Sequence, residues 1–335
     1  MVAENAAIRI LGRPMPEAAE TLSTEMPEQP AGSSPKSPPA VSAWERFCFS
    51  VMRRLVRAHT HFWGIHGLYL SARAFGTLEY LVNFKRRRRV RRMIETVLQR
   101  RLHGPDRRRL VRAHFMRERC DKVFYLIFDY FPTEEARTRF SIANRHLLDE
   151  GLAREKGVYV MLCHHGAHHV VGMLMSLSGY RVAGVRDPNE GAVRRYVQEL
   201  WERRHPDVPR AKVLYSGDFT RPIYRLLKEN YALGSALDVS RVRDPRLRTA
   251  PVQIFGETRN FLTGTLQIAI RSQSTVVQGV IVAEEDFRYR LELIGPMTDP
   301  ETCQDTPEVL QQVLQRYADN IAEYARQYPD HVTRV

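Results

Sequence analysis

The sequence predicts an α/β protein with a largely parallel central sheet flanked by helices, preceded by an N-terminal helical region. Two observations predict this class. From about residue 154 onward, short apolar runs of strand length alternate with helical patterns, as in parallel strands joined by crossover helices. Between residues 43 and 153 the patterns are helical throughout. Of the 335 residues, 43% are hydrophobic, which is enough to bury a sizeable core.

The chain divides into three predicted regions. Residues 1–42 form a leader that we expect to be disordered, because proline, glycine and serine crowd positions 27–39 and few apolar residues can pack. Residues 43–153 form a helical, membrane-proximal region, and residues 154–335 form the α/β core. The first 25 residues lack the apolar centre of a signal peptide.

Several helices are expected in the helical region. The second predicted helix, His61–Phe84, is rich in aromatic and aliphatic residues. It also holds Arg73, Glu79 and two histidines, so it is typical of an interfacial helix rather than a membrane span. The basic run Lys85–Arg92 follows it directly. The predicted helices are Trp44–Arg57, His61–Phe84, a helix that continues the basic run, Arg107–Tyr130 and a short helix after Pro132.

In the core, the uninterrupted apolar run Val158–Cys163 is typical of a strand buried on both faces. The last helix, Thr306–Gln327, places Val309, Val313, Tyr317, Ile321 and Tyr324 on one apolar face. The other predicted strands are Tyr180–Val185, Lys212–Tyr215, Ala232–Val239, Val252–Phe255, Ser274–Val282 and Phe287–Ile294. The other predicted helices are Val170–Ser178, Glu190–Arg204, Thr220–Glu229 and Phe261–Ser272.

The charge balance predicts an anionic partner. Lys and Arg number 51 against 38 Asp and Glu, a net charge of +13. The basic run lies beside the interfacial helix and no nucleic-acid motif accompanies it, so we expect an anionic membrane surface rather than nucleic acid. The four cysteines are far apart, which indicates a reducing compartment, and Cys163 is expected to be a buried structural thiol.

The segment His164–His169 is the most unusual part of the sequence. It contains four of the twelve histidines and lies where a buried strand gives way to a helix, the place where α/β sheets form their sites. Three interpretations compete: a polar loop that happens to be rich in histidine, a metal site built from the i,i+4 pairs, and a general base that removes a proton from an attacking hydroxyl.

The order strand, His, any residue, Gly, helix resembles the H-x-G-N-W-E form of the HxxxxD/E acyltransferase motif in the bacterial lipid A late acyltransferases. In this alignment His164 matches the base, Gly166 matches the glycine, and His169 stands where the family has its carboxylate. The resemblance extends from about His61 to Gln327. It includes the segments Ile142–Leu152, Val185–Asn189, Gly234–Asp238, Val252–Gly256 and Phe261–Thr265.

The resemblance implies a glycerolipid acyltransferase-like fold and a catalytic group of His164, His169 and Asp238. Asp238 ends a predicted strand and can supply the charge that His169 lacks, although a turn cap is the alternative. We expect His169 to hold His164 in one tautomer, and amides near Gly166 to hold the developing oxyanion. Arg186, Thr263 and Gly264 are the other expected substrate-binding residues, with Arg186 facing a phosphate.

The implied reaction moves a fatty acyl group from acyl carrier protein or coenzyme A to a hydroxyl of a lipid or glycolipid. It requires no metal or redox cofactor. The implied location is the cytoplasmic face of the bacterial inner membrane, bound peripherally. Because His169 replaces the carboxylate, the alternative is a catalytically impaired homologue that binds lipid or carrier without turnover.

Overall fold

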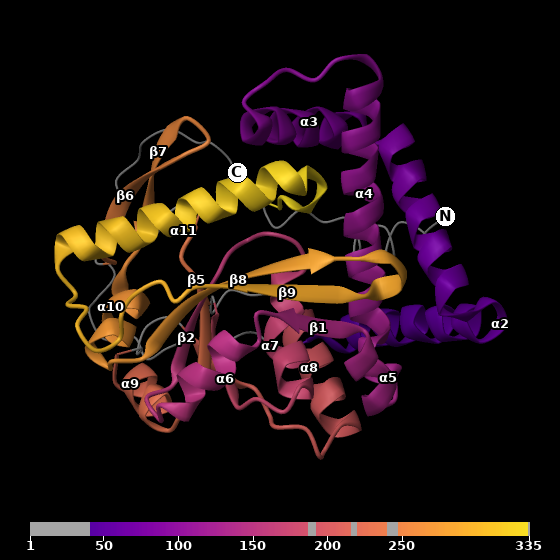
Figure 1. Cartoon of the computed structure of the whole chain (residues 1–335). Helices are drawn as coiled ribbons and strands as arrows, with labels where there is room; N and C mark the ends of the chain where they lie inside the picture. The colour runs from indigo at the N-terminus through magenta and orange to yellow at the C-terminus, as the bar shows by residue number, and fades with distance from the viewer. Residues whose placement is uncertain (1–40, 187–191, 216–219, 240–246, 334–335) are drawn as a thin grey trace, which may run out of the picture.

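A seven-stranded sheet forms the centre of the computed structural model, which describes residues 41–186, 192–215, 220–239 and 247–333 (Figure 1). The strand order is β1-β9-β8-β2-β5-β3-β4, and each neighbouring pair is parallel except β8–β9. The predicted α/β class is therefore confirmed. The strands are β1 Phe140–Ala143, β2 Val158–Leu162, β3 Val182–Arg186, β4 Lys212–Tyr215, β5 Ala232–Ala236, β8 Thr275–Ala283 and β9 Tyr289–Ile294.

Strand β2 shows how the sequence builds the two layers around the sheet. Successive side chains of a strand point to opposite faces. Val158 and Val160 accordingly pack into one hydrophobic core with α7 and α8, while Tyr159 and Met161 pack into another with α9, α10 and α11. All four are at most 1% exposed, as expected of a strand buried on both faces. The helices are α6 His146–Ala153, α7 Val171–Leu177, α8 Ala192–Arg204, α9 Thr220–Lys228, α10 Gly264–Arg271 and α11 Pro307–Gln327.

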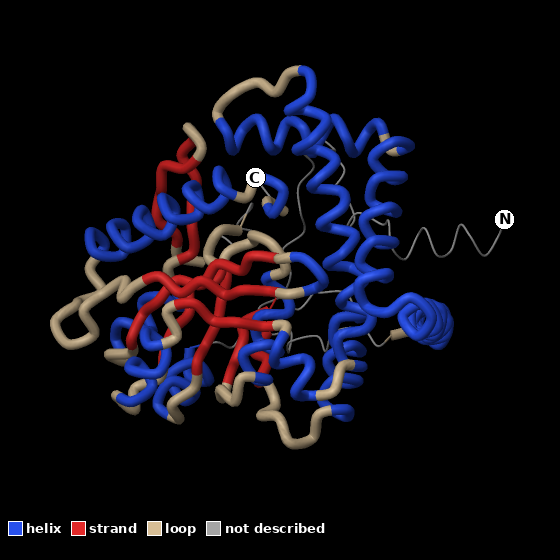
Figure 2. Tube along the Cα trace, turned by 45° about the vertical axis from the view of Figure 1, so that its right-hand side comes forward, coloured by secondary structure: helices blue, strands red, loops and turns tan. Residues whose placement is uncertain are grey.

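The N-terminal region contains α2 Ala43–Val82, α3 Phe84–Leu98, α4 Gly104–Ile127 and α5 Thr133–Thr138. α2 covers both helices predicted first, but it breaks into two arms at Gly64, inside the predicted helix His61–Phe84, where φ is 69° and ψ is 180°. The arms run in different directions, and the second arm lies along α4 (Figures 1 and 2). At Gly76 a Cβ atom would lie 2.6 Å from the Met116 Cα, so this packing depends on the glycine.

Two strands depart from the sequence-based expectation. β6 Thr249–Ile254 and β7 Glu257–Leu262 form an antiparallel hairpin outside the main sheet, so the helix predicted from Phe261 begins instead at Gly264. Phe255 and Gly256 both have positive φ, as a tight two-residue hairpin turn requires. β6 had been predicted as Val252–Phe255, whereas β1 and β7 had not been predicted as strands. The four residues of β1 become a strand only through pairing with β9.

The expected disordered leader lies outside the described residues, apart from positions 41 and 42. Among the helices that the structure describes, none is both long enough and apolar enough to cross a membrane.

Candidate active site

The carboxyl edge of the sheet brings His164 and Asp238 together. β2 and β5 are adjacent and parallel, and their register pairs Leu162 with Ala236. His164 and Asp238 each follow two residues later in the sequence. Because each residue lies two positions beyond a paired strand end, the two side chains reach the same distance past the edge of the sheet. The register of β2 and β5 therefore explains their contact.

Asp238 holds His164 through two contacts. One carboxylate oxygen, Oδ2, accepts the backbone N–H of His164 at 2.8 Å, and the other, Oδ1, lies 3.0 Å from the ring Nδ1. The two side chains are 16% and 14% exposed, so the pair is shielded but reachable. A carboxylate at Nδ1 favours the tautomer in which Nδ1 carries the hydrogen, which leaves Nε2 free to accept a proton.

Tyr317 of helix α11 supports the same pair. Its hydroxyl donates to the Leu162 carbonyl at 2.6 Å and lies 3.3 Å from Asp238 Oδ1. Burial, and then the charge of Asp238, raise the pKa of Tyr317 well above its ordinary value, so the phenol keeps its hydrogen. The sequence placed Tyr317 only on the apolar face of the last helix. That face carries two tyrosines, Tyr317 and Tyr324, and nothing in the sequence singles out Tyr317.

The other three histidines of the segment lie in different surroundings. His165 is 2% exposed and its ring stacks 5.5 Å from that of His331. Burial, followed by the charges of His331 and Arg117, lowers the pKa of His165 to about 3. The His168 ring lies 4.9 Å from the His164 ring, and burial together with its histidine neighbours holds the pKa of His168 well below its ordinary value.

His169 does not take the place of the motif carboxylate beside His164. Its ring meets Tyr125 at 5.1 Å and His168 at 5.7 Å. Burial lowers the pKa of His169 to about 3, and the charges of Arg194, Arg117 and Arg186 act in the same direction. Within the described part of the chain, the contact with the His164 ring nitrogen comes from Asp238.

Gly166 has a structural task that differs from the expected one. Its φ is +58°, and a Cβ atom there would lie 2.6 Å from the Ile281 carbonyl oxygen of β8. Its N–H, expected to hold an oxyanion, donates to the His331 carbonyl at 2.8 Å and is therefore engaged within the protein. The glycine lets the loop lie directly on strand β8, which an L side chain would prevent.

The remaining expected binding residues lie around the same sheet edge. Arg186 is the last residue of β3, the strand on the other side of β5 from β2, and its charge reaches His169. Thr263 precedes α10 and is 4% exposed. The Leu262 N–H donates to the Leu237 carbonyl, which places this helix start beside the strand end that carries Asp238. A Cβ at Gly264 would meet nothing within 4 Å.

Cys163 and the candidate metal ligands are the other reactive groups near His164. Cys163 is 2% exposed, and burial raises the pKa of its thiol well above the ordinary value, so it is the buried structural thiol that was predicted. In the ranges that the structure describes, no three His, Cys, Asp or Glu side chains are grouped as metal ligands.

A cavity of about 240 Å³ lies elsewhere, and His164 is not among its lining residues. Its walls come from α2, α4, the β8–β9 connection and the C-terminal turn, and include Tyr69, Arg73, Arg117, Phe287 and His331. The proposed base is thus separate from this cavity.

A histidine held by a carboxylate at the carboxyl edge of a largely parallel sheet lies where α/β proteins form their sites. Comparison with known protein families shows the family to which the chain belongs. The family model of the bacterial lipid A biosynthesis acyltransferases matches residues 51–329, which is most of the chain. The chain belongs to this family, and the resemblance inferred from its motifs is confirmed. No curated protein matches the chain.

Proposed function

We propose that this protein transfers a fatty acyl group from a thioester donor, acyl carrier protein or coenzyme A, to a hydroxyl of a lipid or glycolipid. His164 is the general base and Asp238 is its supporting carboxylate. The observation that carries the proposal is the double contact of Asp238 with the backbone N–H and the ring Nδ1 of His164.

The proposed step follows from that geometry. His164 Nε2 takes the proton of the acceptor hydroxyl while the oxygen attacks the thioester carbonyl. The carbon–sulfur bond then breaks, and the thiolate leaves with the proton that His164 returns. Asp238 stays ionised and stabilises the imidazolium between the two transfers. The thioester is a co-substrate, and the proposed reaction uses no metal or redox cofactor.

Asp238 supplies the carboxylate that the altered motif lacks at position 169. The family motif draws its acid from the position of His169, whose lowered pKa keeps it neutral near pH 7. In this chain Asp238, two residues beyond the end of the neighbouring strand β5, contacts His164 instead. The rival proposal, a homologue that binds lipid or carrier without turnover, draws its support from the replaced motif acid.

A thiol-release assay with purified protein separates the two proposals. Acyl carrier protein and coenzyme A thioesters are supplied with a lipid A precursor, and free thiol is followed over time. We expect His164→Ala to lower kcat by about 10³-fold, within the range for a lost general base. His146→Ala, at an exposed position on α6, is the matched control. Donor binding without thiol release by the unmodified protein would support the non-catalytic rival.

The exposed surface of α2 supports the proposal that the acceptor is a membrane lipid. Large hydrophobic side chains on both arms and at the start of α3 are 50% to 74% exposed, and we call this surface the apolar α2 face. It comprises Trp44, Phe47, Leu55, Phe62, Trp63, Leu70, Phe75, Leu78, Leu81, Val82 and Phe84. An exposed apolar surface of this extent marks an interaction site.

The neighbouring charge supports an anionic membrane as the proposed partner. The apolar α2 face continues into α3, where Lys85, Arg88, Arg89 and Arg92 are exposed. Aromatic residues beside a basic helix suit the boundary between acyl chains and anionic headgroups. We therefore place the protein peripherally on the cytoplasmic face of the inner membrane, where its lipid acceptor resides.

Vesicle binding tests this placement. Phe62 and Trp63 are 74% and 66% exposed, next to the break in α2. We expect the double variant Phe62→Ser/Trp63→Ser to bind anionic vesicles at least about tenfold more weakly, because two aromatic side chains no longer leave water. Leu247→Ser, an exposed hydrophobic residue away from α2, is the control. Equal binding by both variants would contradict the placement.

A further inference from the structure

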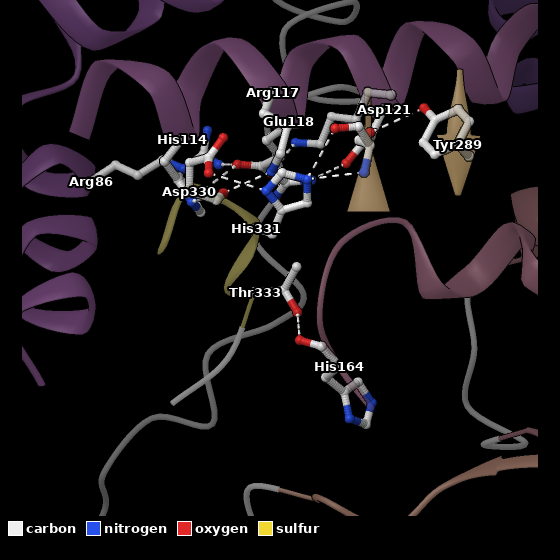
Figure 3. Close-up of polar contacts among 12 residues, drawn as sticks. Arg86, His114, Arg117, Glu118, Asp121, His164, Tyr289, Asp330, His331 and Thr333 are labelled. Atoms are coloured by element: carbon white, nitrogen blue, oxygen red, sulfur yellow. Dashed lines mark hydrogen bonds and ion pairs between the residues drawn. The ribbon is translucent and has the colours of Figure 1, made fainter. Parts of the chain in front are cut away.

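The segment Pro329–Thr333, which we call the C-terminal strap, runs along the loop that carries His164. The Gly166 N–H donates to the His331 carbonyl at 2.8 Å, and His165 and Val332 form an antiparallel bridge. The Thr333 hydroxyl donates to the His164 carbonyl, as Figure 3 shows. The strap therefore contacts three consecutive residues of the loop.

The strap is anchored at its other end to helix α4. Arg117 Nε donates to the Asp330 carbonyl at 2.7 Å, and His114 Nδ1 lies 3.0 Å from the same oxygen. Arg117 also pairs with Asp121 on its own helix (Figure 3). A second anchor joins the strap to the sheet, because the Ala283 N–H donates to His331 Nε2 at 3.0 Å.

Asp330 and His331 join the strap to α4 and to the sheet through charged and hydrogen-bonding groups. Burial alone would raise the pKa of Asp330, but the hydrogen bond from His331 and the charges of His331 and Arg117 hold it well below its usual range. Asp330 Oδ1 lies 3.1 Å from His331 Nδ1, and His331 Nε2 lies 3.0 Å from the Ala283 backbone nitrogen and 3.3 Å from the Ala283 carbonyl oxygen of strand β8. Arg117 is 8% exposed, so the anchor is buried and is unlike a frayed chain end.

We infer that the strap is a positioning element for the base, and that Thr333 is its positioning residue at His164. Both polar groups of the His164 backbone are engaged, since the N–H donates to Asp238 and the carbonyl accepts from Thr333. The inference rests on the proposed function, in which His164 must meet the acceptor hydroxyl within hydrogen-bond reach. Thr333 touches the backbone of His164 and none of the reacting atoms.

The strap also connects the site to the helical region. Arg117 lies on α4, which packs against the second arm of α2 through the close approach at Gly76. A continuous set of contacts therefore runs from the apolar α2 face through α4 and the strap to the His164 loop.

Thr333→Val in the full-length protein tests the inference, because valine keeps the shape and loses the hydroxyl at an exposed position. We expect kcat to fall about fivefold, the effect of one net hydrogen bond, with KM for the donor within about twofold of the original. The melting temperature should not change. Thr333→Ser, which keeps the hydroxyl, should restore kcat.

Hydrogen exchange of the Gly166 amide provides a readout that needs no activity. We expect its exchange to be faster in Thr333→Val than in the unmodified protein and in Thr333→Ser. Unchanged exchange together with unchanged kcat overturns the inference, as does a loss of kcat that Thr333→Ser does not restore. If His164→Ala proves fully active, the proposed function fails, and the exchange measurement alone then decides whether the strap holds the loop.

Discussion

The two ends of the histidine segment lie in opposite electrostatic surroundings. At one end, His164 contacts the carboxylate of Asp238, with the Tyr317 hydroxyl beside that acid. At the other end, His169 lies among the positive charges of Arg186, Arg117 and Arg194. Residues of the same type five positions apart therefore have different chemistry, which the neighbouring strands and helices determine. The position of a histidine in the motif is less informative than the charges that face its ring.

Removing the negative charge of Asp238 beside His164 should lower kcat more than any other change to the histidine segment. Asp238→Asn keeps the size of the side chain but no longer stabilises the imidazolium and can favour the wrong tautomer. We expect kcat to fall by on the order of 10³-fold, with donor binding retained. Steady-state kinetics and thermal melting measure both effects. Activity close to that of the unmodified protein would mean that His164 works without this acid.

Acid titration tests the second feature of the segment, its low-pKa histidines. Burial lowers the pKa of His165 and of His169 to about 3, against an unfolded value near 6.5. Between these values the unfolded chain binds protons that the folded chain does not, so the free energy of unfolding decreases as pH falls from about 6.5 toward 3. The loss is on the order of 1–2 kcal/mol per histidine at pH 5.

Denaturant unfolding at pH 7 and pH 5 measures this loss. His165→Phe should lose less stability between pH 7 and pH 5. Phenylalanine does not titrate, so the unfolded chain no longer gains a proton at this position that the buried residue cannot bind. His146→Phe, at an exposed site, should leave the pH dependence as it is. An identical pH dependence in all three proteins would show that His165 does not remain neutral in the folded protein.

The smallest effect is expected at the motif position itself. His169→Ala removes a ring that is 5.1 Å from Tyr125 and is not paired with His164, so kcat should change by less than about threefold. Comparison with Asp238→Asn under the same conditions sharpens the contrast. If His169→Ala lowered kcat as much as Asp238→Asn does, His169 would be the residue that supports His164, as the motif alignment implies.

The sequence predicted those parts of the fold that depend on local pattern. The apolar run at β2 and the strand at Lys212–Tyr215 were placed within a residue of their positions, because burial on both faces and strand-length runs are visible in the sequence. Strands β1 and β7 were missed, since polar residues such as Thr258 and Asn260 become strand only through pairing with a partner.

The same division holds for the site. His164 and Asp238 were both predicted because each follows an apolar strand, and the register of β2 and β5 then makes them meet. Tyr317 and Thr333 were not predicted as site residues. Their contacts join the sheet edge to positions more than 150 residues away in the chain, which only tertiary packing can bring together. No local pattern marks such a contact.

The break at Gly64 has a geometric consequence for the proposed membrane contact. One straight amphipathic rod resting on a bilayer leaves the attached protein free to roll about the rod axis. Two arms that run in different directions define a plane, and both arms of α2 carry exposed aromatic side chains. Resting on both arms would therefore set one tilt of the molecule, and the sheet edge that carries His164 would keep one height above the lipid.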